Sequence, residues 1–281
     1  MSTTDQTTYN GPDGLAEEER EALEALLYRL ADDELVVAER YIEWAVVAPT
    51  IESDIALTNI AQDELGHARL WYDLLADFGE DERTLVFERD PASFRHSTLV
   101  ELPFEDGDWA DAIVRSYLYD IAEQLRLEAL AETSYLPLRD RVGKVLKEER
   151  YHREHAQNWL ERLVTSDEGT ENVQVAVDRL FPYALTLFEA TEEADERFVE
   201  FGLQTRSLGE MREDWLDVVI PFLESLGVDV PEFDDAADLL PEKLGRDGEH
   251  TDTWPALHAD MTHSYNELGR PEPEKIMDRD E

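Results

Sequence analysis

The stretch AQDELGHARLWYDLL, residues 61–75, has the three-to-four-residue apolar spacing of an amphipathic helix. Glu64 and His67 stand inside its apolar stripe, on the same face as Ile60 and Trp71. Burying an isolated carboxylate is costly unless a positive charge or a proton compensates it. The stretch therefore predicts a helix that places Glu64 and His67 in the core, where the carboxylate needs compensation.

The same pattern occurs a second time in KEERYHREHAQNWLERL, residues 147–163. Glu149 and His152 repeat the Glu-x-x-His spacing, and each lies 85 positions after its counterpart (149 − 64 and 152 − 67). A single Glu-x-x-His in so acidic a chain carries little information. Two copies separated by the same 85 positions indicate that one helical pattern occurs twice in the chain.

The helices expected before these two segments each supply one further carboxylate. Glu39 lies in LVVAERYIEWAV and Glu123 in YLYDIAEQLRLEAL, 84 positions apart (123 − 39). Asp120 and Glu128 are close enough to replace Glu123 if the phase of that helix differs. The two expected stripes are Leu35, Glu39, Ile42 and Val46, and Tyr119, Glu123, Leu127 and Leu130.

Four carboxylates on four core-facing stripes need compensating positive charge. Only Arg126 and Arg153 stand one turn from any of these acids, at the edges of the stripes. A Glu from each of two helices and a Glu-x-x-His from each of the other two is the ligand set of dinuclear carboxylate bundles. We predict a site for two iron ions, with manganese possible because such ligands accept both. The six candidate ligands, also the candidate catalytic residues, are Glu39, Glu64, His67, Glu123, Glu149 and His152.

One more acid precedes each Glu-x-x-His pair. Asp63 lies four residues before His67, and Glu148 lies four residues before His152. Residues four apart are neighbours on a helix surface, so each acid is placed to accept the ring N–H of the histidine in its own helix. The alternative is that both are solvated acids on a helix edge.

Apolar periodicity continues along most of the chain and predicts an all-α protein. We expect an arm over residues 1–14, a single helical domain over 15–269 and a charged tail over 270–281. Residues 80–107 are too irregular for a helix, and Pro182 and Pro221 are expected as kinks or boundaries. The expected helices are 15–30, 32–47, 53–78, 109–133, 137–164, 172–201, 208–226 and 253–268.

Composition limits the partners. The 281 residues include 25 Lys and Arg against 68 Asp and Glu, a net charge of −43 that disfavours nucleic acid and anionic membranes. We interpret the charge as a hydrated surface adapted to high salt, or alternatively as an acidic face for a basic protein partner. The absence of cysteine excludes disulfides and thiolate-bound clusters. No signal peptide or long apolar run is present, so a cytoplasmic protein is expected.

At these residues the sequence resembles the phenylacetic acid catabolic protein family, which comprises the A and C subunits of the phenylacetyl-CoA epoxidase. The resemblance covers residues 23–268, and the spacing is most similar to the C subunit. Its landmarks are EWAVVAPTIESDIALTNIAQDELGHAR, TLVFERDPASFRH, KEERYHREHAQNWLERL, AVDRLFPYALTLFEA and REDWLDVV. C subunits as a rule lack the metal ligands and act as structural partners, whereas all six candidate ligands here match the metal-binding pattern.

The resemblance implies a ferritin-like four-helix bundle with additional C-terminal helices and two irons. It implies an O2- and NADPH-dependent monooxygenase component that epoxidises the ring of phenylacetyl-CoA or a similar acyl-CoA. Electrons would come from a separate iron-sulfur flavoprotein reductase, and other epoxidase subunits would complete a homo- and hetero-oligomer. The alternatives are a noncatalytic structural subunit of the same complex, and a different ferritin-like di-iron oxidase or iron-binding protein.

Overall fold

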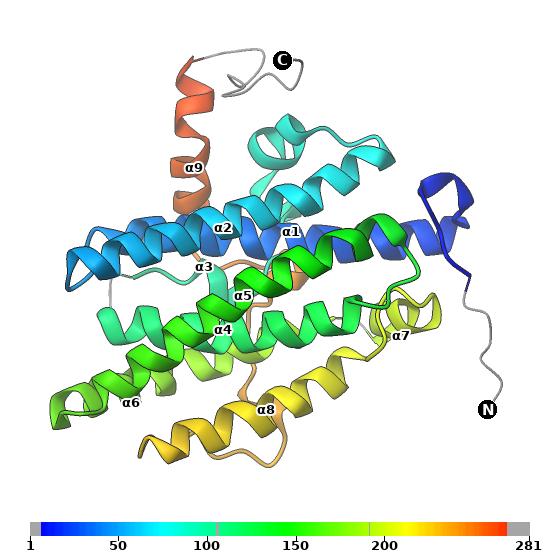
Figure 1. Ribbon diagram of the computed structural model, residues 1–281. Coiled ribbons are helices and arrows are strands. Elements are labelled where there is room, and N and C mark those ends of the chain that lie inside the picture. Colours follow the sequence, from blue (N-terminus) through cyan, green and yellow to red (C-terminus); the bar gives the residue numbers. More distant parts are fainter. Residues whose placement is uncertain (1–6, 105–106, 191, 269–281) are drawn as a thin grey trace.

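The computed structural model describes residues 7–104, 107–190 and 192–268, which form α-helices joined by turns and short single-turn helices (Figure 1). Within these ranges no strand is formed, so the prediction of an all-α protein is confirmed. The helices are α1 (Glu17–Ala45), α2 (Ile51–Leu75), α3 (Thr98–Glu101), α4 (Trp109–Leu130), α5 (Leu136–Leu163), α6 (Asp167–Ala184), α7 (Glu192–Glu200), α8 (Leu208–Ser225) and α9 (Trp254–Leu268).

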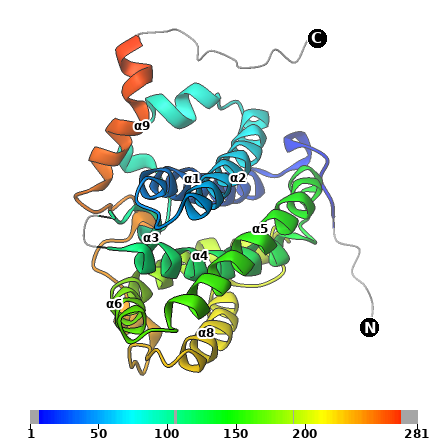
Figure 2. The same cartoon turned by 60° about the vertical axis from the view of Figure 1, so that its left-hand side comes forward.

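Four long helices build the central bundle. Helix α1 packs along α2, α4 packs along α5, and α2 also contacts α5 (Figures 1 and 2). Helices α6 and α8 cover α4 on the side away from α1 and α2 (Figure 2). The prediction of a ferritin-like bundle with additional C-terminal helices is confirmed. The interior is filled by apolar and aromatic side chains, among them Trp44, Trp71 and Tyr119, which are fully buried.

Helix α1 differs from the sequence prediction, because one continuous helix replaces the two expected over 15–30 and 32–47. The apparent break at Asp32 and Asp33 is instead a pair of buried acids in mid-helix. The Tyr72 hydroxyl donates to Asp32 at 2.6 Å, and Asp33 pairs with Arg246. These bonds to distant side chains let the helix continue through two residues that are typical of helix starts.

The region expected as one helix over 172–201 is divided. Helix α6 ends at Ala184, a 3-10 turn follows over Leu185–Phe188, and α7 begins at Glu192. Pro182 lies two residues before the end of α6, near an expected boundary, whereas Pro221 lies inside α8. The irregular segment over 80–107 contains a π-helical turn (Thr84–Glu88), a 3-10 turn (Pro91–Ser93) and α3.

The described part of the expected N-terminal arm, residues 7–14, lies against the bundle. The amide of Tyr9 donates to the carbonyl of Ser134 at 2.8 Å, and the Leu136 amide donates to the Tyr9 carbonyl at 2.9 Å. The Tyr9 hydroxyl donates to Glu19 at 2.6 Å. Residues 1–6 and the expected tail over 270–281 lie outside the described residues. Among the described helices, none combines the length and apolarity needed to cross a bilayer.

Candidate metal centre

Three helices bring five ligand-type side chains together inside the bundle. Helix α1 supplies Glu34, α2 supplies Glu64 and His67, and α5 supplies Glu149 and His152. One ligand atom from each of Glu34, Glu64 and His67 lies within 4.8 Å of the other two, and the same holds for Glu64, Glu149 and His152. Glu64 belongs to both groups. Two cations that share the Glu64 carboxylate would match this arrangement.

The two halves of the centre mirror each other. The Nδ1 atom of His67 lies 3.2 Å from Glu64 and 3.3 Å from Glu149. The Nδ1 atom of His152 lies 3.3 Å from Glu64 and 3.2 Å from Glu149. The side chains of Glu64, His67, Glu149 and His152 are at most 1% exposed. Both imidazoles thus point the same nitrogen at the same two carboxylates.

The outer nitrogen of each imidazole meets an acid from the opposite helix. The Nε2–H of His67 donates to Glu148 at 3.0 Å, and that of His152 donates to Asp63 at 3.4 Å. The sequence prediction paired each acid with the histidine of its own helix, and this pairing is wrong. The structure pairs them across α2 and α5, because the acids point from one helix toward the other. A carboxylate on the outer N–H leaves the inner nitrogen free to bind a metal.

The buried polar atoms of the centre fit a bound cation. In the described part of the chain, both oxygens of Glu34, both oxygens of Glu149 and Oε1 of Glu64 have no hydrogen-bond partner. The same is true of Nδ1 of His152, although it lies close to two carboxylates. Buried polar atoms are normally satisfied, so a convergent group of unsatisfied ones indicates a missing counter-charge. Carboxylate oxygens and imidazole nitrogens are suitable ligands for iron and manganese.

Electrostatics support the same conclusion. Burial and the charges of Glu123 and Glu64 raise the pKa of Glu34 well above its usual range. Burial alone would lower the pKa of His67, but Glu149 and Glu64 raise it to about 10. These raised pKa values favour bound protons on Glu34 and His67 in the metal-free protein. A bound cation would take their place.

Glu39 is not part of this centre. Among the described residues, the ligand group around His67 contains Glu34 and excludes Glu39, which is partly exposed. Steps of three and four from Glu34 pass through the fully buried Val37, Tyr41 and Trp44. The expected stripe was out of phase, since Val46, one of its members, is 84% exposed. Sequence reasoning missed Glu34 because it placed a helix start at Asp32.

On α4, Glu123 and Asp120 are both fully buried. The guanidinium of Arg126 contacts the Glu123 carboxylate, so this acid already has a positive partner. The Ser116 hydroxyl donates to one oxygen of Asp120 at 3.0 Å, and the other oxygen has no partner within the described residues. Glu128 is exposed. Helix α4 therefore offers two candidates for a sixth ligand, and Glu128 is not one of them.

The fold and the buried centre define a helical-bundle protein that gathers carboxylates and imidazoles at its core. The model of the family described as phenylacetic acid catabolic protein matches residues 3–269, so the chain belongs to this family. It is 34% identical over 246 residues to the C subunit of the 1,2-phenylacetyl-CoA epoxidase of Escherichia coli (strain K12), covering 86% of this chain and 95% of that protein. It is 26% identical over 195 residues to the A subunit of the same epoxidase, covering 68% and 62%.

Proposed function

We propose that this chain is a metal-carrying oxygenase subunit of a multicomponent epoxidase in aerobic phenylacetate catabolism. The observation that carries the proposal is the pair of ligand groups that share Glu64. Membership of a family whose relatives include both an A and a C subunit supports the pathway. The convergence of five buried ligand-type side chains supports a catalytic role, because buried acids without a counter-charge destabilise a fold.

In this proposal, two iron ions, with manganese as the alternative metal, bind between the helices. Glu64, His67, Glu149 and His152 would hold them, together with Glu34 from α1 and with Glu123 or Asp120 from α4. When bound, the metals would activate O2, so that with two electrons from a reductase and two protons one oxygen atom is transferred to an aromatic ring and the other leaves as water.

The remaining side chains of the centre prepare the site for this chemistry. Glu148 and Asp63 accept the outer N–H of each imidazole and so keep Nδ1 turned toward Glu64 and Glu149, where it would bind a metal. Tyr41, Trp44 and Trp71 are fully buried and help to exclude water from the bundle interior. The protein thereby orients the ligands and keeps the site dry.

Electrons must come from a second protein. The chain has no cysteine, so it has no thiolates for an iron-sulfur cluster of its own. We infer an NADPH-dependent iron-sulfur flavoprotein reductase as a partner, together with other epoxidase subunits in a homo- and hetero-oligomer. Support for such an assembly comes from the relatives, which are named as subunits of one epoxidase.

The substrate of the proposal is phenylacetyl-CoA or a similar acyl-CoA. An open pocket of about 500 Å³ lies between the first half of α2 and the second half of α5. Trp159, Arg162 and His155 line it, and His155 is one turn from His152 on α5. An aromatic ring and a guanidinium are suited to an acyl-CoA, which carries an apolar acyl group and phosphates.

A second candidate is a noncatalytic structural subunit of the same complex. The identity to the C subunit (34%) is higher than that to the A subunit (26%), which favours this alternative. The contact of Arg126 with Glu123 also favours it, since an internal cation can replace part of the charge of a metal.

Metal content and turnover separate the candidates. The experiment compares the unmodified protein with a variant that carries Glu64→Ala and Glu149→Ala, and with Glu154→Ala, an exposed acid on α5. The oxygenase proposal expects about two irons per chain in the protein and the control, and loss of both in the double variant. It also expects iron-dependent oxidation of phenylacetyl-CoA with O2, NADPH and the reductase. Trace iron in all three proteins would support the structural role, and bound iron without turnover would support a different di-iron protein.

A further inference from the structure

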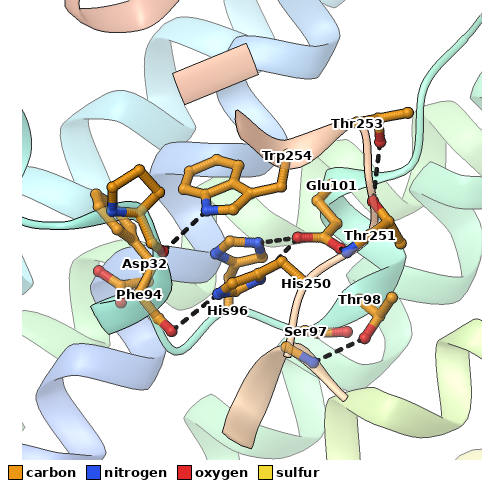
Figure 3. A network of polar contacts seen from close by, with 12 residues as sticks. Asp32, Phe94, His96, Ser97, Thr98, Glu101, His250, Thr251, Thr253 and Trp254 are labelled. Atoms are coloured by element: carbon orange, nitrogen blue, oxygen red, sulfur yellow. Dashed lines mark hydrogen bonds and ion pairs between the residues drawn. The ribbon is translucent and has the colours of Figure 1, made fainter. Parts of the chain in front are cut away.

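Three side chains outside the bundle centre form a second group of ligand type (Figure 3). His96 precedes α3, Glu101 ends α3, and His250 lies between the 3-10 turn Gly245–Asp247 and α9. The Nε2 atom of His96 lies 2.7 Å from Oε2 of Glu101, and Nδ1 of His250 lies 2.8 Å from the same oxygen. One ligand atom of each residue lies within 4.8 Å of the other two.

The carboxylate of this group needs a counter-charge. The side chains of Glu101 and His96 are fully buried, and that of His250 is 5% exposed. Within the described residues, the ion pairs of the Glu101 carboxylate are those with these two histidines. Its Oε2 oxygen faces both imidazoles, and the Thr251 amide donates to its Oε1 oxygen at 2.6 Å. A buried carboxylate that stays ionised requires a cation beside it.

The contacts of His250 indicate where that cation belongs. Its Nε2 atom lies 3.2 Å from the carbonyl oxygen of Phe94, which only accepts hydrogen bonds, so Nε2 carries a proton. In a neutral ring, Nδ1 then presents a lone pair to the ionised Glu101 oxygen (Figure 3). A metal ion between Nδ1 and the Glu101 oxygen would join these two acceptors, in place of a second proton on the ring. A backbone carbonyl on the outer N–H is the support that metal-binding histidines commonly have.

We propose that His96, Glu101 and His250 form a second metal site that binds Zn²⁺ or a similar first-row divalent cation. Two imidazoles and one carboxylate are a ligand set of zinc sites, in which water fills the remaining position. Zn²⁺ lies about 2.0–2.2 Å from its nitrogen and oxygen ligands, so binding would require the three side chains to move apart. The site is independent of the bundle centre, since it shares no residue with the ligand groups there.

The ion would fasten the C-terminal segment to the bundle. The Thr251 amide donates to the other Glu101 oxygen at 2.6 Å, and the Trp254 ring lies 4.4 Å from the His96 ring (Figure 3). Helix α9 begins at Trp254 and stands apart from the long helices of the bundle (Figure 1). Bonds from one metal to segments 149 positions apart, at Glu101 and His250, would hold the start of α9 in place.

Zinc titration of the chelator-treated full chain tests the site. In isothermal titration with ZnCl2, His250→Gln should bind about one Zn²⁺ per chain less than the unmodified protein does. The variant Glu64→Gln with Glu149→Gln should keep about one Zn²⁺ with intact affinity. The control is His263→Gln, an exposed histidine on α9, and it should titrate as the unmodified protein does. Equal zinc content in the unmodified protein and in His250→Gln would overturn the proposal.

Hydrogen exchange gives a readout that does not depend on how His250→Gln folds. In the variant Glu64→Gln with Glu149→Gln and in the unmodified protein, Zn²⁺ should slow exchange of the Thr251 amide and of the first turn of α9 at least tenfold. Exchange in this segment that is the same with and without Zn²⁺ in both proteins would overturn the proposal. If only the bundle centre failed to bind metal, this result would not change. The experiment therefore distinguishes a failure of this proposal from a failure of the proposed bundle centre.

Discussion

The Nε2 atom of His67 on α2 lies 3.0 Å from a carboxylate oxygen of Glu148 on α5. The reciprocal contact joins His152 on α5 to Asp63 on α2 at 3.4 Å. As the position on α2 rises from 63 to 67, its partner on α5 falls from 152 to 148, so the two helices run antiparallel here. Each histidine is thus held by the opposite helix. Metal binding at this centre, as proposed, would therefore be coupled to the packing of α2 against α5.

Removal of either outer acid should weaken metal binding without abolishing it. Glu148→Ala and Asp63→Ala each free the outer N–H of one imidazole, and such losses typically lower metal affinity about 10–100-fold. Competition with a chelator of known affinity measures the change. Glu154→Ala removes an exposed acid from α5 and should have no effect. Affinities equal to that of the unmodified protein in both variants would refute the orienting role.

The two acids of α1 should behave differently. Glu34→Ala removes a buried carboxylate of the centre, whereas Glu39→Ala removes a partly exposed one outside it. We expect a clear loss of bound iron in Glu34→Ala and unchanged iron in Glu39→Ala, measured by elemental analysis. Circular dichroism checks that both variants fold. Loss of iron in Glu39→Ala with unchanged iron in Glu34→Ala would instead identify Glu39 as the ligand.

Stability of the metal-free protein should fall as the pH rises. Burial lowers the pKa of His67, but Glu149 and Glu64 raise it to about 10 from its ordinary value of 6.5. A raised pKa in the folded state contributes stability that is full below the unfolded pKa and is lost as the pH passes through the folded pKa. Burial and carboxylate charges also raise the pKa of Glu34, which acts in the same direction.

Thermal unfolding checks this between about pH 6 and about pH 10. The midpoint of the metal-free protein should decrease across this window, while the metal-loaded protein should lack this decrease because its histidines are already deprotonated. A metal-free midpoint that rises with pH would contradict the raised pKa values of His67 and Glu34.

Asp33 should be a strong determinant of stability. Although burial alone would raise the pKa of Asp33, the guanidiniums of Arg246 and Arg126 lower it to about 2. Asp33→Ala removes the carboxylate that two buried guanidiniums share; Arg126 keeps Glu123, whereas Arg246 is left with backbone carbonyls. Breaking such a buried pair costs about 3–5 kcal/mol in the free energy of unfolding. Denaturant unfolding measures it, with the exposed Asp73→Ala as the control, expected within about 0.5 kcal/mol of the unmodified protein. A loss below about 1 kcal/mol in Asp33→Ala would contradict the assigned role.

The sequence predicted the residues of the centre that occur in pairs, because two ligand-type residues three positions apart define which face of their helix is turned inward. In each Glu-x-x-His pair, two ligand-type residues share one face, and the structure brings Glu64, His67, Glu149 and His152 together. Glu34 is a single acid in a long helix, so no second ligand-type residue on α1 indicates which face is turned inward. Glu34 lies 30 positions before Glu64, and Asp120 lies 29 positions before Glu149. This nearly equal spacing is a signal that could have identified Glu34.

The other errors have one physical origin, which is that they depend on contacts between distant segments. Asp33 looks like a helix start until Arg126 and Arg246 are brought beside it. The exchange of Asp63 and Glu148 between the histidines depends on how α2 and α5 align, and local spacing does not determine this. The group of His96, Glu101 and His250 joins residues about half the chain apart, and no periodicity marks it.

The most direct test of the central claim is an anomalous difference map from crystals of the iron-loaded protein, recorded at the iron edge. The account predicts two peaks inside the bundle with the Glu64 carboxylate between them, one beside His67 and the other beside His152. No peak at these histidines, or a single peak bound without Glu64, would contradict the proposal that this bundle holds a dinuclear centre.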